Sequence, residues 1–240
     1  MTKISTTVSP NLKMSELIID HPNTITVLER MNIAFGFGDQ HIQEIAERYN
    51  LNLHAFVALL QSFEGSIKHD TRLEKEAIPD LLRFLKSSHG HFKGKQIPRI
   101  KKLIVLFSEN IPQKHGQVII SFFDEYIREV EEHFHYEDDD IFPYITEILT
   151  DPRPAKFRMS EFEKNHTDIE QKLLDLKNIL IKYIPEDVSS PYRTKVLKRL
   201  FELEEDLTYH SFIEDHLLVP SVKKMECDIQ NQNERICSKK

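Results

Sequence analysis

The 240-residue sequence predicts an all-α protein. Glycine is scarce, with six residues in the whole chain, and alternating strand-like patterns are almost absent. Apolar residues recur at helical spacing through several long segments, and 40% of the residues are hydrophobic, enough for a substantial core. The net charge of -7 offers no basic surface for nucleic acid, and no apolar run approaches the roughly 20 residues of a membrane span. We therefore expect neither nucleic acid nor a membrane as a partner.

The N-terminal part of the chain predicts a small helical domain between two irregular segments. Residues 1–12 are rich in serine and threonine and are expected to be disordered. Residues 13–66 show short helical patterns, interrupted at residues 35–39 by the glycine-rich turn Phe-Gly-Phe-Gly-Asp. A hydrophobic plug is favoured over a docking or ligand loop for this turn, whose role stays open. Residues 67–77 then form a charged connector.

Four long amphipathic segments within residues 78–225 predict an up-down-up-down four-helix bundle. The first helix begins near Pro79, a residue suited to a first helical turn, and is expected to kink before Pro98. A Ser-x-x-Glu capping box opens the third helix at residue 160. The expected helices cover residues 79–107, 117–140, 160–183 and 190–225.

The last residues, 226–240, form a polar C-terminal tail that contains both cysteines, Cys227 and Cys237. Two peripheral cysteines do not make a disulfide framework, and their use is typical of a reducing compartment. The first residues of the chain contain no hydrophobic signal region. Together these observations predict a cytoplasmic protein.

A His-x-x-x-Glu motif occurs twice in a matched context. His133 precedes Glu137, and His210 precedes Glu214; in each copy a proline follows six residues after the glutamate. The two copies are separated by 77 residues. On a helix, positions i and i+4 share a face, so each pair can hold one metal centre together.

The same offset of 77 residues relates two further histidines, His89 and His166, each 44 residues before the histidine of a motif. The bundle therefore resembles two equivalent hairpins whose matching residues meet at one level of the core. Burying these imidazoles and carboxylates without a metal would leave the desolvation of the carboxylates uncompensated, at several kcal/mol each. The predicted metal ligands are His89, His133, Glu137, His166, His210 and Glu214.

Neighbouring polar residues have simpler interpretations. His91, His135 and His216 lie off the shared face or break the offset, so they are expected to be ordinary histidines. The acidic run at residues 138–140 predicts a solvated face rather than a second cation site. Tyr126 shares the face of the ligands about two turns from Glu137 and is assigned to core packing ahead of a redox role or a contact with a ligand.

Six protein ligands are too many for one zinc ion, which takes three or four. Mixed imidazole and carboxylate donors suit iron, manganese or zinc. Two metals that share both carboxylates as bridges, with two histidines each and an oxo or hydroxo bridge, would keep a vacant position on each ion. The residues alone leave iron, manganese and zinc open, and a vacant position on a redox metal indicates a small diatomic ligand or peroxide.

The ligand set, followed by Phe142-Pro143 and Val219-Pro220, resembles the hemerythrin-type HHE cation-binding domain over about residues 78–225. The set of four histidines and two glutamates is similar to the ligand set of the di-iron proteins associated with repair of iron–sulfur centres, whereas oxygen-carrying hemerythrins have a fifth histidine. Asp20-His21-Pro22 and the following residues resemble the small N-terminal domain of those repair proteins. That domain usually contains an adjacent cysteine pair, and Gly36-Phe37 stands there in this chain.

The resemblance implies two non-heme iron ions, with manganese and zinc ranked below, in a protein of the oxidative or nitrosative stress response. This protein would act in iron–sulfur cluster repair or in handling NO and O₂. Its partners would be iron–sulfur proteins or a redox partner. The alternative is a module that senses O₂, NO or redox state and signals through the N-terminal domain, which the missing cysteine pair favours. A helical scaffold with a vestigial site is the third interpretation. Enzymatic activity and oligomeric state stay open.

Overall fold

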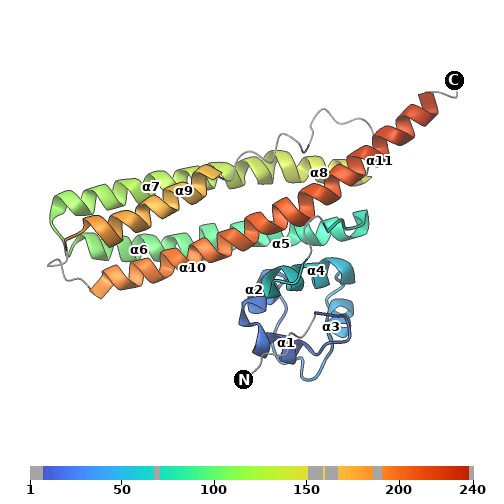
Figure 1. Ribbon diagram of the computed structural model, residues 1–240, viewed down its shortest axis with the longest axis horizontal. Helices are drawn as coiled ribbons and strands as arrows, with labels where there is room; N and C mark the ends of the chain where they lie inside the picture. The colour runs from blue at the N-terminus through green and yellow to red at the C-terminus, as the bar shows by residue number, and fades with distance from the viewer. Residues whose placement is uncertain (1–7, 68–70, 151–158, 160–166, 186–190, 238–240) are drawn as a thin grey trace. The chain divides into compact units, whose positions relative to one another are not determined.

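The computed structural model describes residues 8–67, 71–150, 159, 167–185 and 191–237. These residues are almost entirely helical (Figure 1), and the part of the chain that the structure describes contains one isolated bridge, between Lys13 and His41, and no strand. The protein is an all-α helical bundle, as the sequence predicts. None of the described helices combines the length and apolar character that crossing a membrane requires. The short N-terminal helices are α1 (Met14–Asp20), η1 (Pro22–Thr24), α2 (Ile25–Arg30), α3 (Ile42–Arg48), α4 (Leu53–Glu64) and η2 (Lys75–Ala77).

The other described helices join end to end into long rods, and each rod contains one π-helical segment. No residue separates a π-helical segment from the α-helices beside it, so α-helical and π-helical parts form continuous rods. The rods are α5 (Ile78–His91), η3 (Phe92–Gln96) and α6 (Ile97–Ser108); α7 (Gln113–Tyr136), η4 (Glu137–Ile141) and α8 (Phe142–Thr150); α9 (Thr167–Asn178) and η6 (Ile179–Tyr183); and α10 (Pro191–Ile213), η7 (Glu214–Leu218) and α11 (Val219–Cys237).

A proline explains the position of every one of these π-helical segments. Each segment is five residues long and is followed by one further residue and then a proline. Proline has no N–H to donate and its ring clashes with the carbonyl four residues earlier, so the preceding turn widens. Where we expected a kink in the first rod, the structure therefore has a π-helical turn. The prolines are Pro98, Pro143, Pro185 and Pro220.

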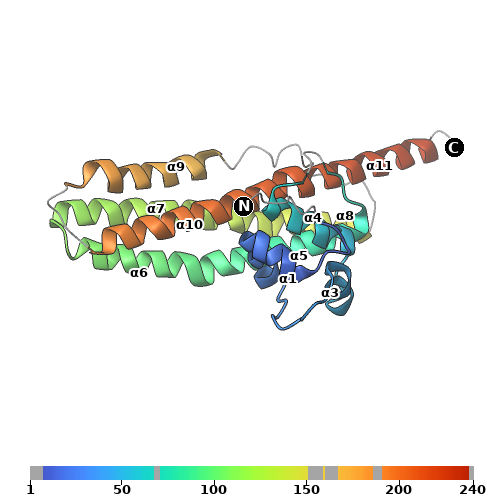
Figure 2. The same cartoon turned by 60° about the horizontal axis from the view of Figure 1, so that its bottom comes forward.

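Residue contacts divide the chain into two units, and the limits after residues 88, 141 and 208 fall within the rods. Unit 2 comprises His89–Ile141 and Phe162–Thr208. In it α6, α7, α9 and most of α10 lie side by side (Figure 2), and their apolar faces form one core. A short turn joins α6 to α7, which makes these two helices antiparallel. The core of unit 2 includes Ile104, Phe123, Tyr126, Leu176 and Leu200.

Gly116 of α7 packs closely against Ser108, the last residue of α6. A Cβ added there would lie 2.9 Å from the backbone oxygen of Ser108 and 3.2 Å from its Cα. Gly116→Ala is expected to lower the free energy of unfolding by about 1–3 kcal/mol because backbone cannot give way, despite the better helix propensity of alanine. Urea denaturation measures the change. Gly90→Ala, with no atom within 4 Å of the added Cβ, is the control and should not destabilise the protein.

Unit 1 comprises Met1–Ser88, Phe142–Glu161 and Tyr209–Lys240. Its N-terminal helices are bound to α5 by three side chains. Asp80 accepts the N–H of Asn52, which caps α4, at 2.6 Å; Arg83 donates to the carbonyl of Met31 at 3.1 Å. Phe63 of α4 packs edge-on against Phe84 of α5, with ring centroids 5.9 Å apart. The domain limits at residues 66, 78 and 225 stay a prediction.

Disorder was expected for residues 1–12, and the structure corrects this for residues 8–12. Val8 is buried, and its carbonyl accepts a hydrogen bond from Gln61 Nε2 at 3.1 Å. The N–H of Ile42 donates to the carbonyl of Leu12 at 3.0 Å. Local composition suggested disorder, but these long-range contacts hold the segment against α3 and α4. Residues 1–7 lie outside the described residues.

The glycine-rich turn at residues 35–39 also differs in part from expectation. Gly36 and Gly38 have positive φ angles of 98° and 59°, a conformation that favours glycine. Phe35, however, is 63% exposed, so it does not plug the domain. At the other end of the chain α11 continues to Cys237, through most of the expected tail, and Cys227 is exposed with a free thiol. The expected start of the third helix at residue 160 lies outside the described residues.

Candidate metal centre

The first His-x-x-x-Glu motif lies where α7 passes into its π-helical segment. His133 is in the last turn of α7, and Glu137 is the first residue of η4. His133 Nε2 lies 3.1 Å from Glu137 Oε1, and the Glu137 side chain is 0% exposed. The i, i+4 spacing thus brings the two side chains together on one face, as the sequence predicts.

The second motif repeats this geometry at the end of α10. His210 Nε2 lies 3.1 Å from Glu214 Oε1, and the Glu214 side chain is also 0% exposed. Glu214 is the first residue of η7, as Glu137 is of η4. In both copies the proline six residues later therefore places the start of the π-helical turn at the glutamate.

His89 brings a third histidine to this level from α5. Its Nε2 lies 3.1 Å from Glu137 Oε2, while His133 contacts the other oxygen of the same carboxylate. The His89 ring stacks on Phe134 with centroids 4.2 Å apart and planes at 20°. A buried aromatic ring therefore determines the orientation of this imidazole.

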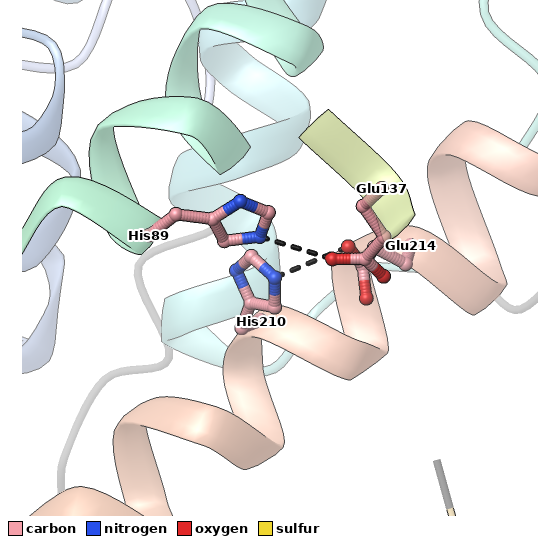
Figure 3. Close-up of side chains that lie close together, drawn as sticks. All are labelled: His89, Glu137, His210 and Glu214. Carbon is pink, nitrogen blue, oxygen red and sulfur yellow. Dashed lines mark ion pairs between the residues drawn. The ribbon is translucent and has the colours of Figure 1, made fainter. Parts of the chain in front are cut away.

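Four of the six predicted ligands form one buried cluster: His89, Glu137, His210 and Glu214. One ligand atom from each lies within 4.8 Å of those from the others. Figure 3 shows the two imidazoles and the two carboxylates directed toward one another. His133 adjoins the cluster through Glu137, and His166 lies outside the described residues. The assignment of all six as ligands stays a prediction.

The chemistry of this donor set fits a metal. Two carboxylates that are both inaccessible to water need a compensating charge, because an ionised carboxylate is costly to desolvate by several kcal/mol. Imidazole and carboxylate together are donors that iron, manganese and zinc accept. The described residues can therefore hold a cation at this cluster.

Comparison with known proteins decides the family. The model of the hemerythrin HHE cation-binding domain matches residues 80–222, more than half of the chain. The chain belongs to the hemerythrin HHE cation-binding family. No curated protein and no solved structure matches it. The match confirms the hemerythrin resemblance; it begins after the N-terminal helices, and the closer likeness to iron–sulfur repair proteins is not part of it.

One residue of this hemerythrin domain has a role that we did not predict. Asp138 was expected on a solvated face, yet its Oδ1 lies 2.9 Å from His89 Nδ1, and its Oδ2 accepts from Lys93 at 3.2 Å. Partial burial alone would raise the pKa of Asp138, but the bonds to His89 and then Lys93 outweigh it and hold that pKa below its usual value. A carboxylate on the second nitrogen of a ligand histidine sets its tautomer and orientation.

A signal for this role is present in the sequence. Asp138 and Asp215 are separated by 77 residues, the offset of the predicted ligands. The rest of the acidic run behaves as expected, because Asp139 is exposed and pairs with the exposed His135.

Asp138→Ala is expected to weaken metal binding by about 10–100-fold, since His89 would lose the group that orients it. Competition with a chromophoric chelator measures the affinity. Asp139→Ala, the adjacent change on the same turn, is the matched control and should bind metal as the wild type does. Equal affinities for the two variants would show that the contact between Asp138 and His89 has no such role.

Tyr126 lies in the core of unit 2, in agreement with the packing role that we expected. It is 1% exposed and stacks on Phe123 with ring centroids 6.3 Å apart. Burial, followed by the charge of Glu204, raises the pKa of its phenol, so the hydroxyl stays protonated. In this hemerythrin domain Tyr126 is thus a neutral core residue.

Proposed function

We propose that this hemerythrin-type protein holds a non-heme di-iron centre and handles O₂, NO or peroxide in the response to oxidative and nitrosative stress. The observation that supports the proposal is the pair of fully buried glutamates, each in contact with a histidine one turn earlier in its helix. Repair of iron–sulfur centres is the process that the sequence resemblance favours for this activity, in the cytoplasm.

The number of predicted donors, four histidines and two glutamates, favours two ions over one. Two carboxylates are buried side by side, and the sequence repeat supplies an equal set of donors from each half of the domain. His89 and His133 approach opposite oxygens of Glu137, so these three residues would hold metal together. Iron, when bound, would supply reversible binding of a diatomic molecule and one-electron chemistry. The chain orients the donors through Phe134 and Asp138 and excludes water by burial.

Metal analysis of protein purified without oxygen tests this proposal. Two iron ions per chain are expected in the wild type and fewer in His133→Ala. His135→Ala is the matched control, because His135 lies on the same helix but is exposed and pairs with Asp139. Less than one metal per chain in the wild type, with no further loss in His133→Ala, would contradict the proposal.

Sensing is the second candidate function, and the N-terminal helices support it. Gly36-Phe37 stands where the repair proteins have a cysteine pair, so this loop has no thiol chemistry to contribute. Phe63 of α4, one of the N-terminal helices, stacks on Tyr209, the residue directly before His210. Reactivation of an oxidised iron–sulfur protein would favour repair; reversible NO or O₂ binding with a conformational response and no reactivation would favour sensing.

A further inference from the structure

Tyr209 directly precedes His210 and is held by the N-terminal helices. Its ring stacks on Phe63 of α4, with centroids 4.3 Å apart and planes at 23°. Its hydroxyl accepts a hydrogen bond from Asn23 Nδ2 at 3.1 Å. Tyr209 and its two partners belong to unit 1, and the contact spans well over one hundred residues of sequence.

We infer that Tyr209 couples the N-terminal helices to the metal centre, so that binding at His210 and Glu214 is communicated to α4. This inference rests on the proposed function, because it requires a metal at the centre. It names a regulatory route that the family match does not supply, since the match starts at residue 80.

The geometry of a helix supports this coupling. Consecutive residues on an α-helix point about 100° apart, so Tyr209 faces the N-terminal helices while His210 faces the carboxylates. The two side chains share one hydrogen-bonded turn, and His210 is 2% exposed, which leaves it little room to move alone. A shift of the His210 ring upon binding therefore moves the backbone that supports the Tyr209 ring.

The receiving side of the contact is tightly packed. Phe63 is 5% exposed and packs against both Tyr209 and Phe84 of α5. A displaced Tyr209 ring would disturb a packed aromatic group rather than move through solvent. Packed groups of this kind change between discrete arrangements, which allows a small shift to be passed on.

Coupling of this kind is reciprocal. If metal binding changes the stability of the contact between Phe63 and Tyr209, then weakening that contact must change the metal affinity by the same factor. Typical couplings change an affinity about 5–150-fold. A residue with a purely structural role would alter stability without this matched change.

Hydrogen exchange and metal affinity, measured on the full chain, test the coupling. Loading the wild type with Fe(II) without oxygen is expected to change the exchange rates of α4 amides at least about 5-fold. Phe63→Ala should abolish that change and shift the Fe(II) dissociation constant by the same factor. Tyr209→Phe keeps the ring and removes the acceptor of this hydrogen bond, and Asn23→Ala removes its donor; both should give smaller shifts in a chain that stays folded. Phe35→Ala, an exposed aromatic of the same helical region, is the control and should leave both measurements unchanged.

Two outcomes separate this inference from the proposed function. If the wild type binds Fe(II) but α4 exchanges at the same rate with and without it, and the Tyr209→Phe and Asn23→Ala affinities equal that of the wild type, the coupling is overturned and the proposed function stands. If the wild type binds no Fe(II), the proposed function is overturned and the coupling with it.

Discussion

Removal of metal by a chelator is expected to destabilise the wild-type protein by several kcal/mol, the cost of leaving buried carboxylates without a compensating cation. Glu137 and Glu214 are both 0% exposed, so water cannot replace the metal without opening the core. Urea denaturation of the metal-loaded and the chelated protein measures the difference. Chelation that leaves the midpoint unchanged would contradict this prediction.

Replacing both glutamates with glutamine is expected to abolish the dependence of stability on metal. Glu137→Gln combined with Glu214→Gln removes the two negative charges, so metal content should fall below one ion per chain and chelation should have no effect. The variant should also be at least as stable as the chelated wild type, because a neutral amide is cheaper to bury than a carboxylate. Glu64→Gln is the matched control, since the Glu64 side chain is only 6% exposed and lies 3.9 Å from a histidine, His21, outside the cluster; this variant should retain the metal.

Phe134→Ala is expected to lower the free energy of unfolding by about 3–5 kcal/mol, the usual effect of deleting a buried phenylalanine ring. Phe134 is 1% exposed and lies between His89 and Phe92, with ring centroids 4.2 Å and 5.5 Å away. The substitution should also weaken metal binding, because the His89 imidazole would lose the surface on which it stacks.

Phe123→Ala separates these two effects of Phe134. Phe123 is buried in the same helix and the same core, and its ring stacks on Tyr126, which is not a predicted ligand. Both variants should lose similar stability, and only Phe134→Ala should lose metal affinity. Equal affinities for the two would show that the stack on His89 does not matter for binding.

The sequence predicts the helical fold and four members of the cluster because both depend on regular spacing. The period of a helix places His133 beside Glu137 and His210 beside Glu214, and the offset of 77 residues leads to His89. Spacing of this kind predicts position reliably, because residues four apart in a helical sequence lie on the same face of the folded helix. Where the geometry departs from a regular helix, spacing alone is a poorer guide.

The missed features depend on tertiary contacts or on backbone chemistry. Asp138 looked solvated because its partner, His89, lies on another helix. Val8 looked disordered because its hydrogen bond comes from Gln61. The π-helical turns were missed because Pro143 and Pro220 were used in the sequence only as markers of the repeat. Their effect on the preceding helical turn, which they widen, was not considered.

The π-helical turn η7 sets how α11 is rotated about its axis relative to Glu214. Beyond this turn, Ser221 accepts the N–H of Leu73, Lys224 pairs with Glu74, and Glu226 accepts the hydroxyl of Tyr144. If Pro220→Ala let η7 close into an ordinary α-helix with the same number of residues, α11 would rotate by about 100° relative to Glu214. All three contacts would then be lost together, although no atom of them had been substituted. The phase of α11 is thus set by the π-helical form of η7, which Pro220 imposes on the chain.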